Sequence, residues 1–220
     1  MVRIITDSAA DFEPFELEKW KITCIPIKVL LGDQEYEENI NLSKDQFFEL
    51  LASTGATPKT SQPSLQILID LFEEAKQAGE EAIYITLSSA LSGTYQTASM
   101  TCEDMDSDKL HVFDSRNATG GQRLLVEYAV RLRDEGKSAR EILDGLESIR
   151  DKIVLFACID TLEYLYRGGR ISQTVYKLGT MAQVKPIIRV SEEGAIEVKN
   201  HNVHTQKRCN TLLVHHLLHK

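Results

Sequence analysis

The stretch AIYITLSSALSGTYQTASMTC, residues 82–102, decides the fold class. It opens with an apolar, β-rich run at 82–87, passes through a turn rich in hydroxyl side chains, and continues from Gly93 as a helical pattern. A short apolar run bounded by turn residues is typical of a buried strand in a parallel sheet. The order of strand, polar turn and helix therefore predicts one unit of an α/β fold.

The same alternation extends along most of the chain. Other short β-rich runs lie at 2–6, 24–31, 110–113 and 153–159. Amphipathic helical patterns lie at 43–52, 65–78, 93–102, 120–135 and 138–150, and the clearest places Leu65, Leu68, Ile69, Phe72 and Ala75 on one stripe. We predict a parallel sheet built from these strands and covered by helices on both faces.

A second, smaller unit is predicted to begin near residue 160. The stretch TLEYLYRGGRIS, residues 161–172, carries a Gly-Gly pair. The apolar run VKPIIRV at 184–190 begins a pattern that differs from the alternation of strands and helices before it. We therefore expect an N-terminal α/β lobe over residues 1–159 and a C-terminal lobe over residues 160–220.

Composition and charge restrict the possible partners and location. The chain has 220 residues, 42% of them hydrophobic and 26% charged, which is ordinary for a globular protein. Its net charge of −8 argues against nucleic acid as a partner. The N-terminus reaches an acidic residue at Asp7 and lacks the apolar core of a signal peptide, and the longest apolar run, 153–159, is too short to span a bilayer. We expect a cytoplasmic protein with no integral membrane association.

Small polar side chains follow three of the predicted strands. They are Asp7 and Ser8, Ser88 and Ser89, and Asp114 and Ser115. In an open α/β sheet the carboxyl ends of the strands form the edge where ligands bind. Each pair could also cap the next helix. Three pairs together with TSQPS, residues 60–64, favour a ligand-binding edge.

These motifs lack the groups that catalysis needs. Ser92 lies in Ala-Leu-Ser-Gly and not in a G-x-S-x-G elbow, while His111 lies inside a predicted strand. The pair His215 and His219 has the spacing of metal ligands on a helix, but no carboxylate is evident beside it. We predict no catalytic residue, no metal site and no cofactor.

The hydroxyl-rich turn is suited to holding an anion. A helix that begins near Gly93 presents free backbone amides and the positive end of its dipole, and Ser92 adds a hydroxyl. Thr60 and Ser61 precede another predicted helix and can face the same charge. A carboxylate or phosphate would fit this arrangement. If the rest of the ligand is apolar, its burial supplies most of the affinity, at ~0.8 kcal/mol per methylene.

Five motifs resemble those of the DegV family in order and approximate separation: ITDSAADF, TSQPS, SSALSGTYQ, FDSRNATGGQ and LEYLYRGGRIS. The resemblance runs from about residue 3 to residue 190. It implies a two-lobed α/β fold that encloses one long-chain fatty acid between the lobes. The chain is similar to the acyl-binding subunit of bacterial fatty acid kinase, which presents the carboxylate to a separate ATP-binding kinase subunit that makes the acyl phosphate.

The resemblance also implies roles for individual residues. Thr60 and Ser92 would hydrogen-bond the carboxylate, with Ser61 and the Gly93 amide as neighbours. We include Ser8 and Ser115 in the predicted ligand-binding set because they end two of the strands.

Two arginines of the YRGGRIS motif take a different predicted position. Arg167 and Arg170 would lie near the entrance or on the surface that faces the kinase. A lobe-to-lobe ion pair or a solvent-exposed loop charge is the alternative for both.

The chain departs from the family pattern near its end. Family members continue into a segment that completes the second lobe and contributes a histidine near the carboxylate. The stretch NHNVHTQKRCNTLLVHHLLHK, residues 200–220, does not match that segment. We therefore expect a smaller C-terminal lobe that is incomplete, either truncated or divergent at its end.

Two other functions remain open on the sequence. Ser92 or Ser89 could be the nucleophile of an acyl hydrolase whose base comes from elsewhere in the fold. The same anion site could instead serve a binding module for a small phosphorylated or polar metabolite. The family resemblance favours a lipid-binding protein that is not itself an enzyme.

Overall fold

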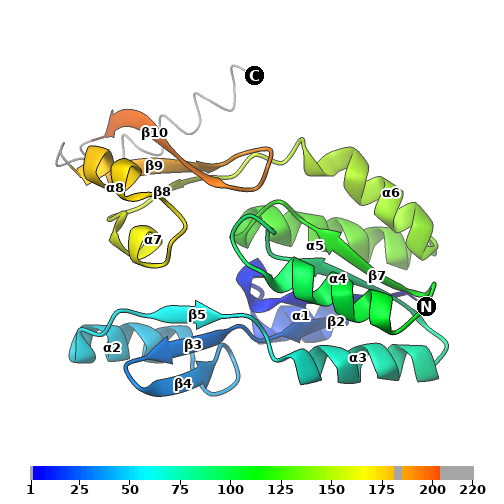
Figure 1. The fold of residues 1–220 in the computed structure, drawn as a ribbon. Helices are drawn as coiled ribbons and strands as arrows, with labels where there is room; N and C mark the ends of the chain where they lie inside the picture. The colour runs from blue at the N-terminus through cyan, green and yellow to red at the C-terminus, as the bar shows by residue number, and fades with distance from the viewer. Residues whose placement is uncertain (1, 181–184, 204–220) are drawn as a thin grey trace.

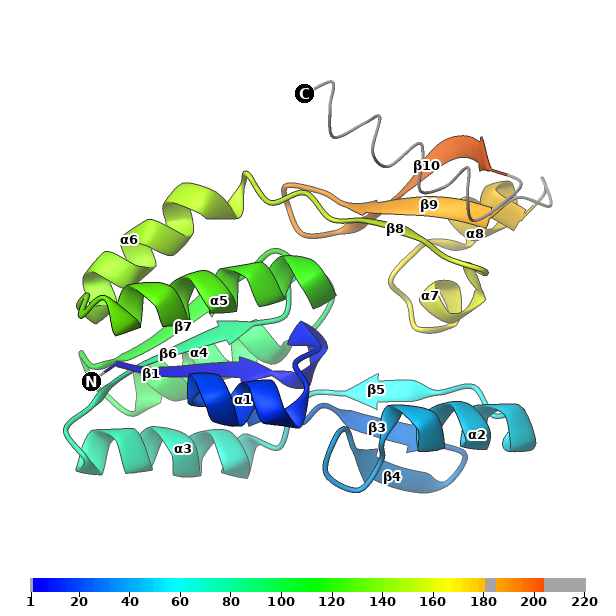
Figure 2. The ribbon, with the colours of Figure 1, turned by 180° about the vertical axis from the view of Figure 1, so that it is seen from behind.

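The chain forms three β-sheets flanked by helices over residues 2–180 and 185–203, which are the residues that the computed structural model describes (Figure 1). One sheet is parallel and two are antiparallel. The antiparallel sheets stand beyond the carboxyl edge of the parallel sheet (Figures 1 and 2). Of the predicted divergent end, residues 200–203 belong to β10, whereas residues 204–220, with His204, His215, His216 and His219, lie outside the described residues.

The parallel sheet has four strands in the order β2-β1-β6-β7. Their bounds are β1 Val2–Asp7, β2 Ile22–Ile25, β6 Glu81–Thr86 and β7 Leu110–Asp114. The helices that flank it are α1 Pro14–Trp20, α3 Leu65–Gln77, α4 Thr94–Asp104, α5 Thr119–Asp134 and α6 Ala139–Arg150. A short 3-10 helix, η1 Ser8–Ala10, follows β1.

Two apolar cores lie on opposite faces of the parallel sheet. Ile4 packs into the core shared with α5 and α6, whereas Ile5 packs into the core shared with α3 and α4. Both side chains are completely buried because successive residues of a strand point to opposite faces, and helices cover each face. This arrangement confirms the predicted parallel sheet with helices on both sides.

The second sheet is antiparallel, in the order β4-β3-β5, and carries α2 Lys44–Thr54. Its strands are β3 Lys28–Leu31, β4 Gln34–Glu37 and β5 Lys59–Ser61. We predicted one strand over residues 24–31, and this was wrong. The run divides at Pro26 and Ile27, so that β2 ends in one sheet and β3 begins in another. Proline has no amide hydrogen for a ladder, which favours a break there.

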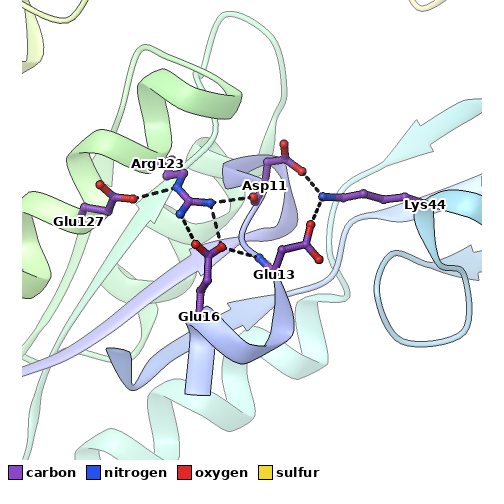
Figure 3. Close-up of polar contacts among 6 residues, drawn as sticks. All are labelled: Asp11, Glu13, Glu16, Lys44, Arg123 and Glu127. Atoms are coloured by element: carbon purple, nitrogen blue, oxygen red, sulfur yellow. Dashed lines mark hydrogen bonds and ion pairs between the residues drawn. The ribbon is translucent and has the colours of Figure 1, made fainter. Parts of the chain in front are cut away.

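Charged side chains connect α2 to the segment that follows β1 (Figure 3). The Lys44 ammonium lies 2.8 Å from Asp11 and 2.6 Å from Glu13. On α5, Arg123 pairs with Glu16 of α1 at 2.5 Å, and this ion pair lowers the pKa of Glu16 to about 2. The Lys44 contacts join the small antiparallel sheet's helix to the parallel-sheet unit, whereas the Arg123 pair joins two helices of that unit.

The third sheet is antiparallel, in the order β10-β9-β8, with strands β8 Phe156–Cys158, β9 Lys185–Val190 and β10 Ile196–Val203. The helices α7 Glu163–Arg167 and α8 Gln173–Thr180 lie beside it (Figure 1). We predicted that 153–159 joins the parallel sheet, and this was wrong, because β8 pairs with β9 instead. The division into lobes at residues 159 and 160 stays a prediction.

Candidate functional site

A cleft of about 790 Å³ lies where the three sheets meet. Its walls come from residues 60–62 at the end of β5, residues 87–93 between β6 and α4, and residues 168–170 between α7 and α8. Two of these segments adjoin strands of different sheets, and the third joins the helices α7 and α8. The segment 87–93, which we call the cleft loop, follows the carboxyl end of β6, as expected for a ligand site in an open α/β sheet.

Five of the predicted site residues line this one cleft. They are Thr60, Ser61, Ser92, Gly93 and Arg170. They come from three segments that are distant in sequence, and the fold brings these segments together around one cleft. Apolar side chains of Ile27, Leu87, Ala90 and Leu91 complete much of the lining.

The cleft loop leads directly into α4. Gly93 is the N-cap of that helix, and the Ser92 hydroxyl accepts a hydrogen bond from the Thr94 amide at 3.3 Å. The Ser92 and Thr94 hydroxyl oxygens lie 2.9 Å apart. The start of a helix offers unpaired amides and a partial positive charge, so the end of α4 that adjoins the cleft favours an anion.

Gln62 is a cleft residue that sequence reasoning did not single out. Its side-chain oxygen accepts a hydrogen bond from Thr97 of α4 at 2.6 Å, which fixes the amide beside the cleft. A Cβ atom on Gly93 would lie 2.3 Å from the Gln62 Nε2 atom. Glycine at 93 therefore leaves room for the Gln62 side-chain amide beside the start of α4. The only sequence signal for Gln62 was its place within TSQPS.

Ser8 and Ser115 lie outside the lining of this cleft. The Ser8 hydroxyl donates to Glu38 at 2.6 Å and accepts from the Ile27 amide at 2.9 Å. Ser115 is completely buried, and its hydroxyl donates to the Asn117 carbonyl at 3.0 Å. Both hydroxyls thus support loops at the edge of the sheet.

The two arginines of the YRGGRIS motif have different surroundings. Arg170 lines the cleft and donates from Nε to the Leu91 carbonyl at 3.0 Å and from Nη1 to the Gly168 carbonyl at 2.6 Å. It connects the α7–α8 segment to the cleft loop through backbone oxygens and not through an ion pair. Arg167 lies outside the lining, where it pairs with Glu163 at 2.5 Å and contacts Thr57.

Two aspartates at the carboxyl ends of β1 and β7 anchor the cleft loop by accepting hydrogen bonds from it. Asp7 is completely buried and accepts hydrogen bonds from the Leu87 amide at 2.8 Å and the Gln122 amide group at 3.1 Å. Burial raises the pKa of Asp7 to about 6 despite these donors. Asp114 accepts from both the amide and the hydroxyl of Ser89, at 3.1 and 2.5 Å.

The geometry gives Ser92 no basic partner among the residues that the structure describes. His111 is the only histidine whose side chain falls in that part of the chain, and it lies near the start of β7, at the sheet edge opposite the cleft. Over the same residues no group of three or more His, Cys, Asp and Glu side chains could hold a metal ion. Across those residues, too, every helix is too short or too polar to cross a membrane.

The fold is that of an α/β protein with a cleft, the candidate ligand site, at the junction of a parallel sheet and two antiparallel sheets. A family model described as "Uncharacterised protein, DegV family" matches residues 1–218, and the chain belongs to the DegV family. This result confirms the family predicted from the motifs.

A curated relative and three solved structures support this assignment. The DegV domain-containing protein YteA of Lactococcus lactis is 37% identical over 216 residues, which cover 96% of this chain and 75% of that protein. A fatty-acid-binding DegV family protein of Thermus thermophilus superposes with a TM-score of 0.87 at 27% identity, over 98% of this chain and 76% of that one. DegV of Bacillus subtilis, a fatty acid binding protein, gives a TM-score of 0.85 at 30% identity, over 98% and 76%.

The third structure is a stearic acid-binding protein of Eubacterium ventriosum, with a TM-score of 0.86 at 26% identity, over 98% of this chain and 75% of that one. Together these structures confirm the predicted mixed α/β fold.

Proposed function

We propose that the protein binds a long-chain fatty acid and holds its carboxylate in the cleft between Thr60 and Ser92. The observation that carries this proposal is that hydroxyl groups from β5 and from the cleft loop line one cleft beside the start of α4. Relatives from Thermus thermophilus, Bacillus subtilis and Eubacterium ventriosum bind fatty acids, and they share this fold.

The polar wall of the cleft suits a carboxylate. Hydroxyl donors to a charged acceptor form strong hydrogen bonds, each worth roughly 1.5 to 3 kcal/mol. Thr60 and Ser92 would donate to the carboxylate oxygens, with Ser61 and the Gly93 amide beside them. Arg170 adds a positive charge to the same wall, where its guanidinium donates to the Leu91 and Gly168 carbonyls.

The acyl tail would extend from the apolar part of the lining into the space between the lobes. Ile27, Leu87 and Leu91 provide apolar surface next to the polar wall. Each methylene removed from water contributes about 0.8 kcal/mol, so a long chain supplies more affinity than the head group.

In this proposal the protein presents its ligand and leaves the chemistry to a partner. A separate ATP-binding kinase subunit would phosphorylate the carboxylate, and both proteins would act in the cytoplasm. His111 lies near the start of β7, at the sheet edge opposite the cleft loop, which argues against it as the base of a hydrolase that uses Ser92.

The first test is to identify what the purified protein carries. We expect organic extraction and mass spectrometry to recover long-chain fatty acids, and titration with carboxyl-labelled palmitic acid to shift the carboxyl NMR signal on binding. Recovery of a polar phosphorylated metabolite without lipid would contradict the proposal and favour the metabolite module.

The second test concerns presentation. With the ATP-binding subunit of a fatty acid kinase, ATP and hydroxylamine, the loaded protein should yield the acyl hydroxamate that reports acyl phosphate. Release of free palmitic acid from a palmitoyl ester by the protein alone, abolished in Ser92→Ala, would instead show a hydrolase.

A further inference from the structure

The cleft loop is organised around Ser88, a residue that does not itself line the cleft. Ser88 is completely buried, and its hydroxyl accepts a hydrogen bond from the Ala90 amide at 3.2 Å. Its carbonyl accepts from the amides of Leu91 and Ser92 at 3.0 and 3.1 Å. The position of the Ser92 hydroxyl therefore depends on where Ser88 is held.

Ser88 is held by two segments: its amide donates to the Asn117 carbonyl at 2.9 Å, and its side chain contacts the turn between β9 and β10. Its hydroxyl donates to the Gly194 carbonyl at 2.9 Å, which joins two segments 106 residues apart. Within the turn, the Gly194 amide donates to Ser191 at 3.0 Å, and the Ser191 amide donates to Ala195 at 2.8 Å. The tip of this hairpin thus rests on the first part of the cleft loop.

Glycine at position 194 satisfies two separate requirements. Its φ of +82° lies in the left-handed region that side chains disfavour. A Cβ atom there would also lie 2.1 Å from the Ser88 hydroxyl oxygen and 3.0 Å from the Arg116 Cα atom. Gly136, with a φ of +79°, has nothing within 4 Å of the same added atom. Only Gly194 therefore combines a turn conformation with close contact to the cleft loop.

The cleft loop is anchored both by the parallel-sheet unit and by the chain beyond residue 160. On the first side, Asp7 and Asp114 hold Leu87 and Ser89, and the Asn117 carbonyl accepts from the Ser88 amide. On the other side, Gly194 holds the Ser88 hydroxyl and Arg170 holds the Leu91 carbonyl. Separation of the third sheet from the parallel sheet would break these last two attachments.

We infer that Gly194 is a positioning residue for the cleft: its contact with Ser88 sets the cleft loop in the conformation that receives the ligand. The effect on fatty acid affinity rests on the proposed function. The effect on the loop itself does not, because the contacts exist in the free protein.

The test compares Gly194→Ala with Gly136→Ala, which imposes nearly the same backbone strain without a clash. In the ligand-free protein we expect hydrogen exchange of the 87–93 amides to rise at least about tenfold in Gly194→Ala and to stay at the wild-type rate in Gly136→Ala. Palmitic acid affinity should fall roughly tenfold in Gly194→Ala only.

Ser88→Ala provides a second variant that adds no atoms, so a result is still obtained if Gly194→Ala does not fold. It removes both hydrogen bonds of the hydroxyl, to the Gly194 carbonyl and from the Ala90 amide. For the loop amides other than Ala90 we expect the same rise in exchange, and in the double variant an effect smaller than the sum of the two, because both changes break the contact between Ser88 and Gly194. Equal exchange in Gly194→Ala, Gly136→Ala and Ser88→Ala would overturn the inference. If wild-type protein binds no fatty acid, the proposed function fails, and the exchange rates alone decide the role of Gly194.

Discussion

Thr60 and Ser92 are the residues on which the proposed carboxylate site depends most directly. Replacing either by alanine removes one hydroxyl donor to a charged group, so palmitic acid affinity should fall roughly tenfold to a hundredfold. Ser92→Ala also loses an acceptor for the Thr94 amide and should cost about 1 kcal/mol of folding stability. Isothermal titration calorimetry measures the affinity, with Ser148→Ala as the control because its exposed hydroxyl lies on α6. Unchanged affinity in the double variant would contradict the proposed site.

Asp7 makes stability depend on pH in a direction unusual for an aspartate. Burial raises its pKa from 3.8 to about 6, so the folded protein resists ionising this carboxyl. Below pH 3.8 the carboxyl is protonated in both states, and no penalty exists. As the pH rises to about 6, the unfolded chain ionises first, and folding stability falls by on the order of 3 kcal/mol.

Asp7→Asn should remove this contribution, because the amide does not titrate. Urea unfolding across the same pH range measures the free energy of unfolding for both proteins. The difference between them isolates Asp7 from other groups, such as Glu38, whose pKa burial also raises. A wild-type slope that persists unchanged in Asp7→Asn would show that another group causes it.

The sequence identified residues that line the cleft where their placement depends on local structure. Ser92 and Gly93 were predictable because a hydroxyl and a glycine stand at the start of a helix. Ser8 carried the same signal of a small polar residue after a strand, yet its hydroxyl bonds Glu38 and the Ile27 amide. A pattern of residue types does not reveal whether a hydroxyl is already occupied within the protein.

At the scale of elements, helices were predicted more reliably than strand partners. The patterns at 43–52 and 138–150 correspond closely to α2 and α6, because each begins with a serine capping box and carries its own apolar stripe. Strand pairing is not local. Nothing within 24–31 or 153–159 identifies the sheet that each run joins. Gln62 was missed for the same reason, because its contact with α4 depends on where β5 lies.

The capping box of α6 allows a prediction at this scale. The Ser138 hydroxyl accepts from the Glu141 amide at 3.4 Å, while the Glu141 carboxylate accepts from the Ser138 amide at 2.9 Å. Ser138→Ala should lower the free energy of unfolding by about 1 kcal/mol and leave fatty acid affinity unchanged, since α6 lies outside the cleft lining. Denaturant unfolding and calorimetry measure the two quantities. A matched loss of affinity would imply that α6 influences the cleft.

At the scale of the whole molecule, the cleft is a junction whose walls belong to different sheets. Thr60 belongs to the β4-β3-β5 sheet, Ser92 follows the parallel sheet, and Arg170 follows α7. A ligand that contacts all three walls would add a link between units that side chains already join, such as Lys44 with Asp11 and Ser88 with Gly194. Ligand binding should therefore stabilise the arrangement of the sheets as well as the cleft.

Saturation with palmitic acid tests this link between the sheets. A ligand at a hundred times its dissociation constant raises folding stability by about 2.7 kcal/mol, and the melting temperature should rise accordingly. Because the ligand bridges the walls, limited proteolysis between α6 and β8, at residues 151–155, should slow in the loaded protein. Ser92→Ala with Thr60→Ala should show neither effect at the same palmitic acid concentration. Equal protection in that variant would mean that the fatty acid binds elsewhere, and the three-walled site would then be wrong.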